Sequence, residues 1–136
     1  MSDKINARIT FHKISAEVNV FHFVNIIKKH WLLISATVLA LITLLSLTPL
    51  PHLPSVPGSD KTHHFIAYAG LFFPVALAKP KHWLLIGLLF AFWSGAIELI
   101  QPYVNRYGEW LDMLANSVGL LCGFVLAWLT NKLIKQ

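Results

Sequence analysis

Four long runs of apolar residues alternate with short polar stretches along the chain. The first run extends from Trp31 to Leu50 and carries no charged side chain. The second extends from Lys61 to Ala78, the third from His82 to Gln101, and the fourth from about Leu111 to Leu129. Each approaches the roughly 20 residues that an α-helix needs to cross the hydrocarbon of a bilayer. The pattern therefore predicts an all-α integral membrane protein with four transmembrane helices.

Composition supports a membrane protein. Of the 136 residues, 56 % are hydrophobic and only 12 % are charged, and the mean hydropathy is +0.62. A soluble domain of this size rarely carries so few charges. Between the first two runs, the stretch "PLPHLPSVPGSD" is too rich in proline to continue a helix, so it is predicted to be a loop outside the membrane.

The first 29 residues are basic and partly amphipathic. Val20, Phe23, Val24 and Ile27 recur at helical spacing, which suits a helix lying on the inner leaflet, while a disordered leader is the alternative. We expect the first apolar run to remain as an anchor because it is too long for a typical signal core. The predicted divisions are a basic cytoplasmic segment (1–29), a four-helix transmembrane domain (30–130) and a short cytoplasmic tail (131–136).

The basic residues are distributed unequally between the two sides that four spans create. The N-terminal segment, the loop between the second and third runs, and the tail together hold nine Lys and Arg residues, whereas the opposite side holds only Lys61 and Arg106. The positive-inside rule then places both termini in the cytoplasm. The isoelectric point near 9.6 accordingly indicates topology and contact with anionic membrane lipids, with no nucleic-acid partner.

Polar side chains gather at the outward ends of the last three predicted helices. Spacings of three or four residues place the polar side chains of each helix on one face. These faces consist of Lys61, His64 and Tyr68 on the second helix, Ser94, Glu98 and Gln101 on the third, and Asp112 and Asn116 on the fourth. The three faces are predicted to meet at one membrane depth.

Two of these charges lie at the unfavourable ends of their helices. A carboxylate near a helix C-terminus, such as Glu98, and an ammonium near an N-terminus, such as Lys61, are each disfavoured by roughly 0.3–1 kcal/mol. We expect Glu98 to pair with Arg106 or Lys61, and Asp112 with the other cation. Asp60 and Asp112 open their helices, so an ordinary capping or first-turn role is an alternative for each.

Three segments in this order resemble the signature of the VanZ-like family of small bacterial membrane proteins: "SDKTHHFIAY", "ELIQPYVNR" and "DMLANSVGLLCG". The resemblance covers roughly residues 30–130. It implies a multi-pass protein of the bacterial cytoplasmic membrane with a role in the cell envelope. The family takes its name from a protein associated with resistance to the glycopeptide teicoplanin, and most members have no established chemistry. The matching positions are Asp60, Lys61, His64, Phe65, Tyr68, Glu98, Gln101, Arg106, Asp112, Asn116, Gly119 and Gly123.

Two functional hypotheses follow from the polar residues. In the first, the outward site binds and modifies the head group of a lipid or a lipid-linked envelope precursor, with Glu98 or Asp112 as general base and His64 as a further catalytic residue. In the second, the same residues form a buried ion-pair network in a non-enzymatic module that binds lipid or a partner. In the first hypothesis, the predicted ligand-binding residues are Asp60, Lys61, Tyr68, Gln101, Arg106 and Asn116.

No cofactor or metal site is predicted. His64, Glu98 and Asp112, with His63 or His52 nearby, match none of the familiar metal-ligand motifs.

Small residues recur every four positions in the last two helices. Such stripes allow close helix packing in lipid and are predicted to clamp the third and fourth helices together, with generic helix packing or a homo-oligomer contact as the alternative. The stripes consist of Gly87, Ala91 and Gly95, then Gly119, Gly123 and Ala127.

Overall fold

The computed structural model describes residues 19–49 and 59–134, and every regular element in these ranges is helical. A first helix over Asn19–Lys29 precedes the others. The remaining elements are α2 (Trp31–Leu47), α3 (Asp60–Ala78), α4 (Trp83–Ile100), the 3₁₀ helix η2 (Gln101–Val104) and α5 (Trp110–Ile134). All four predicted apolar runs are helices, and α5 continues past its predicted end.

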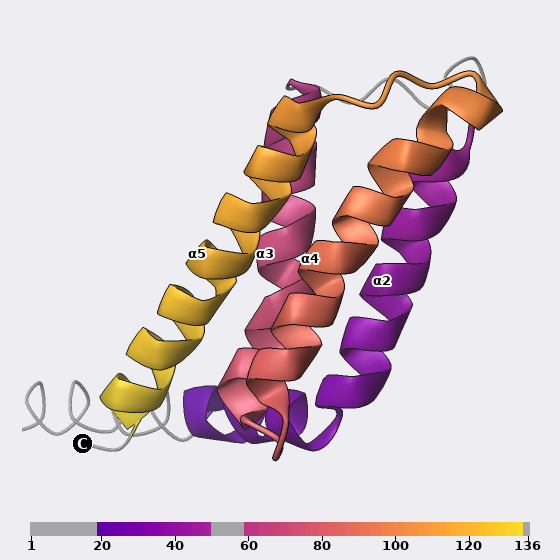
Figure 1. Cartoon of the computed structure of the whole chain (residues 1–136). Helices are drawn as coiled ribbons and strands as arrows, with labels where there is room; N and C mark the ends of the chain where they lie inside the picture. Colours follow the sequence, from indigo (N-terminus) through magenta and orange to yellow (C-terminus); the bar gives the residue numbers. More distant parts are fainter. Residues whose placement is uncertain (1–18, 50–58, 135–136) are drawn as a thin grey trace, which may run out of the picture.

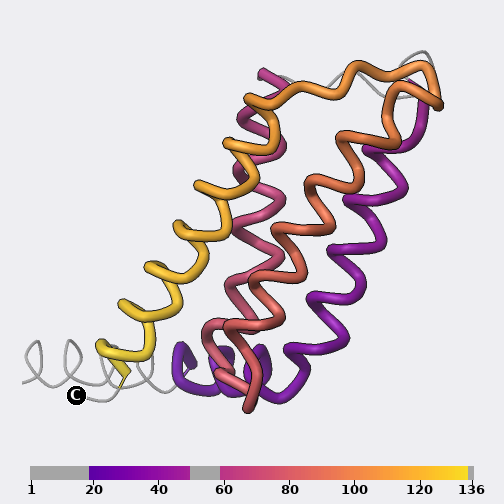
Figure 2. Tube along the Cα trace, viewed as in Figure 1, coloured from indigo at the N-terminus to yellow at the C-terminus, as the bar shows by residue number. Residues whose placement is uncertain are grey.

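Helices α2 to α5 run alongside one another, and the helix over Asn19–Lys29 lies across one end of them (Figure 1). This first helix is bent by 70° from α2. Its Val24 is buried and Ile27 packs against the core, whereas Val20 and Phe23 are exposed. The predicted helical conformation is therefore present over residues 19–29, while residues 1–18 lie outside the described part. The tube in Figure 2 shows η2 and the start of α5 at the opposite end of the bundle.

Two helical segments in the described residues are long and apolar enough to cross a membrane, Trp83–Val104 and Trp110–Ile134. The bent pair formed by Asn19–Lys29 and α2 counts as a third if it is one span. Helix α2 alone has 17 residues, and α3 begins with a strongly polar turn. The all-α membrane character is thus confirmed, whereas four spans and their orientation stay a prediction.

Helices α3 and α5 approach each other closely because glycines on α5 face the backbone of α3. A methyl group built on Gly119 would overlap the carbonyl oxygen of Phe65, and one on Gly123 would overlap that of Ala69. Ala127 continues the same face and is fully buried. Small residues at such positions permit backbone contact where larger side chains would separate the helices.

This pairing corrects the prediction that the small residues clamp the third and fourth helices together. The α5 stripe packs on α3, because its glycines meet α3 backbone. On α4, a methyl group at Gly87 would overlap the ring of Phe72, which also belongs to α3. A methyl group on Gly95 would lie 3.7 Å from the sulfur of Met113 on α5, an ordinary contact distance. The α5 stripe is buried within the chain, and the predicted oligomer contact stays a prediction.

Aromatic rings join α3, α4 and α5 at the end far from η2. The rings of Phe72 and Trp83 stack with centroids 6.2 Å apart, and those of Trp83 and Phe124 stack at 5.5 Å. Between α2 and α3, the Ser35 hydroxyl donates a hydrogen bond to the Leu71 carbonyl at 3.2 Å. These contacts fix one end of the bundle and leave the other end to polar side chains.

We expect Gly119→Val to lower the stability of the protein in detergent by about 1–3 kcal/mol, the usual cost of overpacking a close contact. The matched control is Gly70→Ala on α3, where no atom lies within 4 Å of the added methyl group. The control should leave stability unchanged or raise it, since alanine favours helix more than glycine does. Thermal unfolding followed by circular dichroism measures both, and equal melting temperatures for Gly119→Val and wild type would contradict the packing described here.

Candidate functional site

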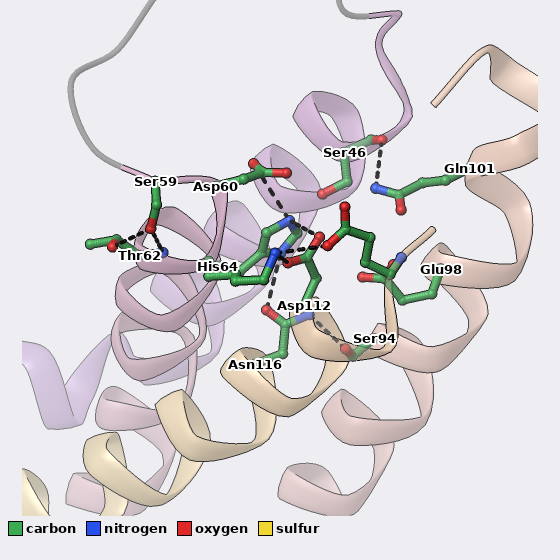
Figure 3. A network of polar contacts seen from close by, with 12 residues as sticks. Ser46, Ser59, Asp60, Thr62, His64, Ser94, Glu98, Gln101, Asp112 and Asn116 are labelled. Atoms are coloured by element: carbon green, nitrogen blue, oxygen red, sulfur yellow. Dashed lines mark hydrogen bonds and ion pairs between the residues drawn. The ribbon is translucent and has the colours of Figure 1, made fainter. Parts of the chain in front are cut away.

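The amide of Asn116 connects three helices at the η2 end of the bundle (Figure 3). Its Oδ1 lies 3.1 Å from Nδ1 of His64 on α3, and its Nδ2 donates a hydrogen bond to Oγ of Ser94 on α4 at 2.7 Å. All three side chains are buried. Because Oδ1 only accepts, Nδ1 of His64 carries the proton in this arrangement.

An ion-pair cluster lies next to this chain of hydrogen bonds. The ammonium of Lys61 donates to Oε2 of Glu109 at 2.7 Å and lies 3.4 Å from Oδ1 of Asp112. Asp112 is buried, whereas Lys61 and Glu109 are partly exposed. Nε2 of His64 faces Oδ1 of Asp60 at 3.9 Å and Oδ2 of Asp112 at 4.0 Å. The predicted ion pair between Asp112 and a cation is confirmed, and the cation is Lys61.

Glu98 is held by backbone rather than by a cation. Its Oε2 accepts a hydrogen bond of 2.9 Å from the backbone N–H of Glu109, the residue that precedes α5. The positive end of the α5 dipole lies there, so it offsets the unfavourable place of this carboxylate at the C-terminal end of α4. The predicted pairing of Glu98 with Arg106 or Lys61 is wrong for the described residues, where no such ion pair lies within 4.0 Å.

The loop between η2 and α5 folds tightly back on α4. Asn105 adopts a left-handed conformation with φ of 56°, and the N–H of Arg106 donates to the Gln101 carbonyl at 3.0 Å. A methyl group on Gly108 would overlap the carbonyl oxygen of Glu98. Glycine at this position therefore lets the loop pack against α4, where the Glu98 carboxylate binds the N–H of Glu109.

Both acids that open helices occupy first-turn positions. Ser59 caps α3, since its Oγ accepts a hydrogen bond from the N–H of Thr62 at 3.2 Å. Asp60 follows in the first turn of α3, and Asp112 lies in the first turn of α5. Each carboxylate therefore has the favourable dipole position that the sequence predicted.

The structure brings all nine predicted site residues to one end of the bundle. Several of them present buried polar atoms without a hydrogen-bond partner among the described residues. These atoms are the Tyr68 hydroxyl, Glu98 Oε1, Gln101 Oε1, Arg106 Nη1 and Asp112 Oδ1. Since buried polar groups are nearly always hydrogen-bonded, this end of the bundle is suited to binding polar groups of another molecule.

Sequence reasoning missed three residues of the site: Ser46, Ser59 and Glu109. Ser94 was expected on the polar face of the third helix, and serine is a residue type that caps helices, so Ser59 also carried a signal. Glu109 precedes the last apolar run but was not assigned a role. Ser46 contributes only its backbone carbonyl oxygen, which accepts a hydrogen bond from Nε2 of Gln101 at 3.3 Å. Every residue type has this carbonyl group, so the sequence could not indicate the contact.

A groove of about 650 Å³ lies between α4 and α5. Its wall is mostly apolar, formed by residues such as Leu88, Ala96 and Met113, and its polar end is formed by Glu98 and Glu109. A second cavity of about 400 Å³ shares Leu88 and continues along α4 toward the aromatic contacts at the far end. The groove is thus apolar along most of its length and reaches the polar site at one end.

Fold and site together define a helical membrane protein with a buried polar network at one end of its bundle. The chain matches the VanZ/LLP1 family model over residues 2–131, and it belongs to that family. This match confirms the resemblance found in the three sequence segments. Neither the comparison with curated proteins nor the comparison with solved structures finds a match.

We expect Asn116→Ala to destabilise the protein by about 1–3 kcal/mol, since it leaves buried groups of His64 and Ser94 without their partner. The control is Ser117→Ala, its neighbour on α5, whose exposed hydroxyl bonds only to its own helix. That change should stay within about 0.5 kcal/mol. Thermal unfolding should also show that Asn116→Ala and Ser94→Ala are non-additive. Additive effects would contradict a connected network.

Proposed function

We propose that this protein binds a lipid or lipid-linked precursor of the bacterial cell envelope at the junction of the groove and the polar site. The main support for this proposal is that an apolar groove of about 650 Å³ ends at Glu98 and Glu109. A lipid has the same division, with a hydrocarbon tail and a polar head. The tail would lie between α4 and α5, and the head group would contact the polar side chains.

The helix arrangement supports a four-span topology for this function. The C-terminal end of α5 and the helix over residues 19–29 lie at the same end of the bundle (Figure 1). Lys28, Lys29 and Lys132 lie in these segments, so the positive-inside rule supports a cytoplasmic location for that end. The polar site then faces outward across the cytoplasmic membrane, where envelope precursors present their head groups.

Modification of the head group is a further part of the proposal. A general base must come within hydrogen-bond reach of the proton that it abstracts. Glu98 has one oxygen bound to the loop and the other, Oε1, without a hydrogen-bond partner among the described residues. This arrangement fixes the carboxylate and leaves Oε1 for a substrate hydroxyl. Glu98 is therefore the favoured base, with Asp112 and His64 beside it and Arg106 available for an anionic group.

An effect on glycopeptide susceptibility follows from the same proposal. A protein that binds envelope precursors would change how many of them are available, which is one route to altered glycopeptide susceptibility. This part of the proposal depends on family membership and on the groove, and it requires no contact between the protein and the antibiotic.

The second candidate function is a structural module without catalysis. It is favoured by the two hydrogen bonds that link His64 to Asn116 and Asn116 to Ser94, because they join three helices within the bundle. Buried polar networks of this kind stabilise helix packing in membrane proteins. In that case the groove would still hold lipid or a partner, but Glu98 would serve only to fasten the loop.

We expect native mass spectrometry of gently extracted protein to show a defined lipid or lipid-linked adduct. Ala96→Trp, which fills the groove, should reduce the bound fraction at least about tenfold, equivalent to 1.4 kcal/mol. The control is Leu126→Trp on an exposed part of α5 that does not line the groove. Equal binding by both variants and wild type would contradict the groove as the lipid site.

Glu98→Gln distinguishes the catalytic from the structural candidate. If Glu98 is the base, the variant should retain the lipid with its head group unmodified, because glutamine cannot accept the proton, and its melting temperature should stay near wild type. Mass spectrometry of the bound lipid and thermal unfolding provide both readouts. The same head group in variant and wild type, combined with a large loss of stability, would exclude the catalytic role.

A further inference from the structure

We propose that Asp60, His64 and Asp112 bind a divalent metal cation of the zinc type. One ligand atom from each residue lies within 4.8 Å of the others. His64 and Asp60 are four residues apart on α3, and Asp112 comes from α5. The inference goes beyond the proposed lipid function and does not depend on it.

The distances suit a cation shared by the three side chains. Nε2 of His64 lies 3.9 Å from Oδ1 of Asp60 and 4.0 Å from Oδ2 of Asp112. Zinc binds histidine nitrogen and carboxylate oxygen at about 2.0–2.2 Å, which places the ligand atoms of a tetrahedral site roughly 3.4 Å apart, so the three side chains would have to move inward slightly to share one ion. A nitrogen and two carboxylate oxygens also form a donor set that zinc accepts.

The hydrogen bond on the other side of the imidazole directs a lone pair toward this position. Nδ1 of His64 donates to Asn116 Oδ1, whose amide is in turn oriented by its bond to Ser94. A neutral imidazole with its proton on Nδ1 has a free lone pair on Nε2, and Nε2 faces the two carboxylates. Metal-binding histidines typically donate their second ring N–H in this way.

Asp112 provides an independent observation. Its side chain is 3 % exposed, and its Oδ1 accepts no hydrogen bond among the described residues, with only the Lys61 ammonium 3.4 Å away. Its Oδ2 points toward Nε2 of His64 (Figure 3). A buried carboxylate that faces a nitrogen lone pair is unfavourable unless a cation lies between them. A metal ion on Oδ2 and Lys61 on Oδ1 would neutralise the group.

The charge balance of the whole site favours a divalent cation. Among the described residues at this end, the carboxylates of Asp60, Glu98, Glu109 and Asp112 outnumber the cations Lys61 and Arg106. With neutral His64, two negative charges are in excess. A divalent ion removes this excess, and three protein ligands leave an open coordination position for water or a phosphate oxygen.

Sequence motifs do not predict this site, because its ligands come from two helices and match no familiar spacing. The candidates from the sequence were His64, Glu98 and Asp112. The structure brings Asp60, and not Glu98, close to the other two. His63 lies outside the three-residue cluster, and His52 lies outside the described residues.

The test is zinc titration of full-length protein purified in detergent without a histidine tag and treated with a chelator. Calorimetry and elemental analysis should show one Zn²⁺ per chain. Asp60→Asn changes an exposed ligand, so the fold should be retained, and it should weaken binding at least about tenfold, the lower end of what loss of an outer-shell partner costs. Glu109→Gln removes the same charge from a non-ligand that pairs with Lys61, so it should weaken zinc binding by less than Asp60→Asn does.

A spectroscopic readout tests the tautomer separately. Nitrogen NMR of metal-free protein should show the His64 proton on Nδ1, and zinc should shift the Nε2 resonance. A proton on Nε2, with His64 held as an ion-paired imidazolium, would overturn the proposal. So would the absence of stoichiometric zinc binding, or an equal loss of affinity in Asp60→Asn and Glu109→Gln, because the second result would reflect net charge alone.

Discussion

The contact between α3 and α5 is the constraint on which the polar site depends. Gly119 and Gly123 let the two helices approach until the α5 glycines meet α3 backbone. At that separation His64 lies within hydrogen-bond distance of Asn116, and Lys61 lies 3.4 Å from Asp112 across the interface. A larger residue at either glycine would separate both pairs together. Packing in the apolar part of the bundle therefore sets the geometry of the charged part.

The weaker approach of α4 to α5 has the opposite consequence. Gly95 has no close backbone neighbour on α5, and a groove remains between the two helices. The helices are joined instead near their ends, by the Ser94 to Asn116 bond and by the loop that Glu98 holds. The bundle is thus tightly packed around the polar network and leaves an apolar groove between α4 and α5.

Periodicity predicted the helices and their polar faces well, because both depend only on local spacing. Asp112 and Asn116 share a buried face as expected, and so do Ser94 and Gln101. The sequence could not show which neighbour a glycine stripe meets, since that choice depends on the whole bundle. The partner of Glu98 was equally hidden because it is a backbone N–H. The cluster with Asp60 required both the α3 turn and the position of α5.

The groove and the charged cluster share Glu109, which makes the two parts of the site interdependent. Glu109 borders the groove and also holds the ammonium of Lys61 at 2.7 Å. Under the proposed function, a head group that donated to Glu109 would compete with Lys61 for this carboxylate. Lys61 would then be left with Asp112 alone, and its pairing there would strengthen as the competition for Glu109 increased. Occupation of the groove would in this way strengthen the ion pair between Lys61 and Asp112.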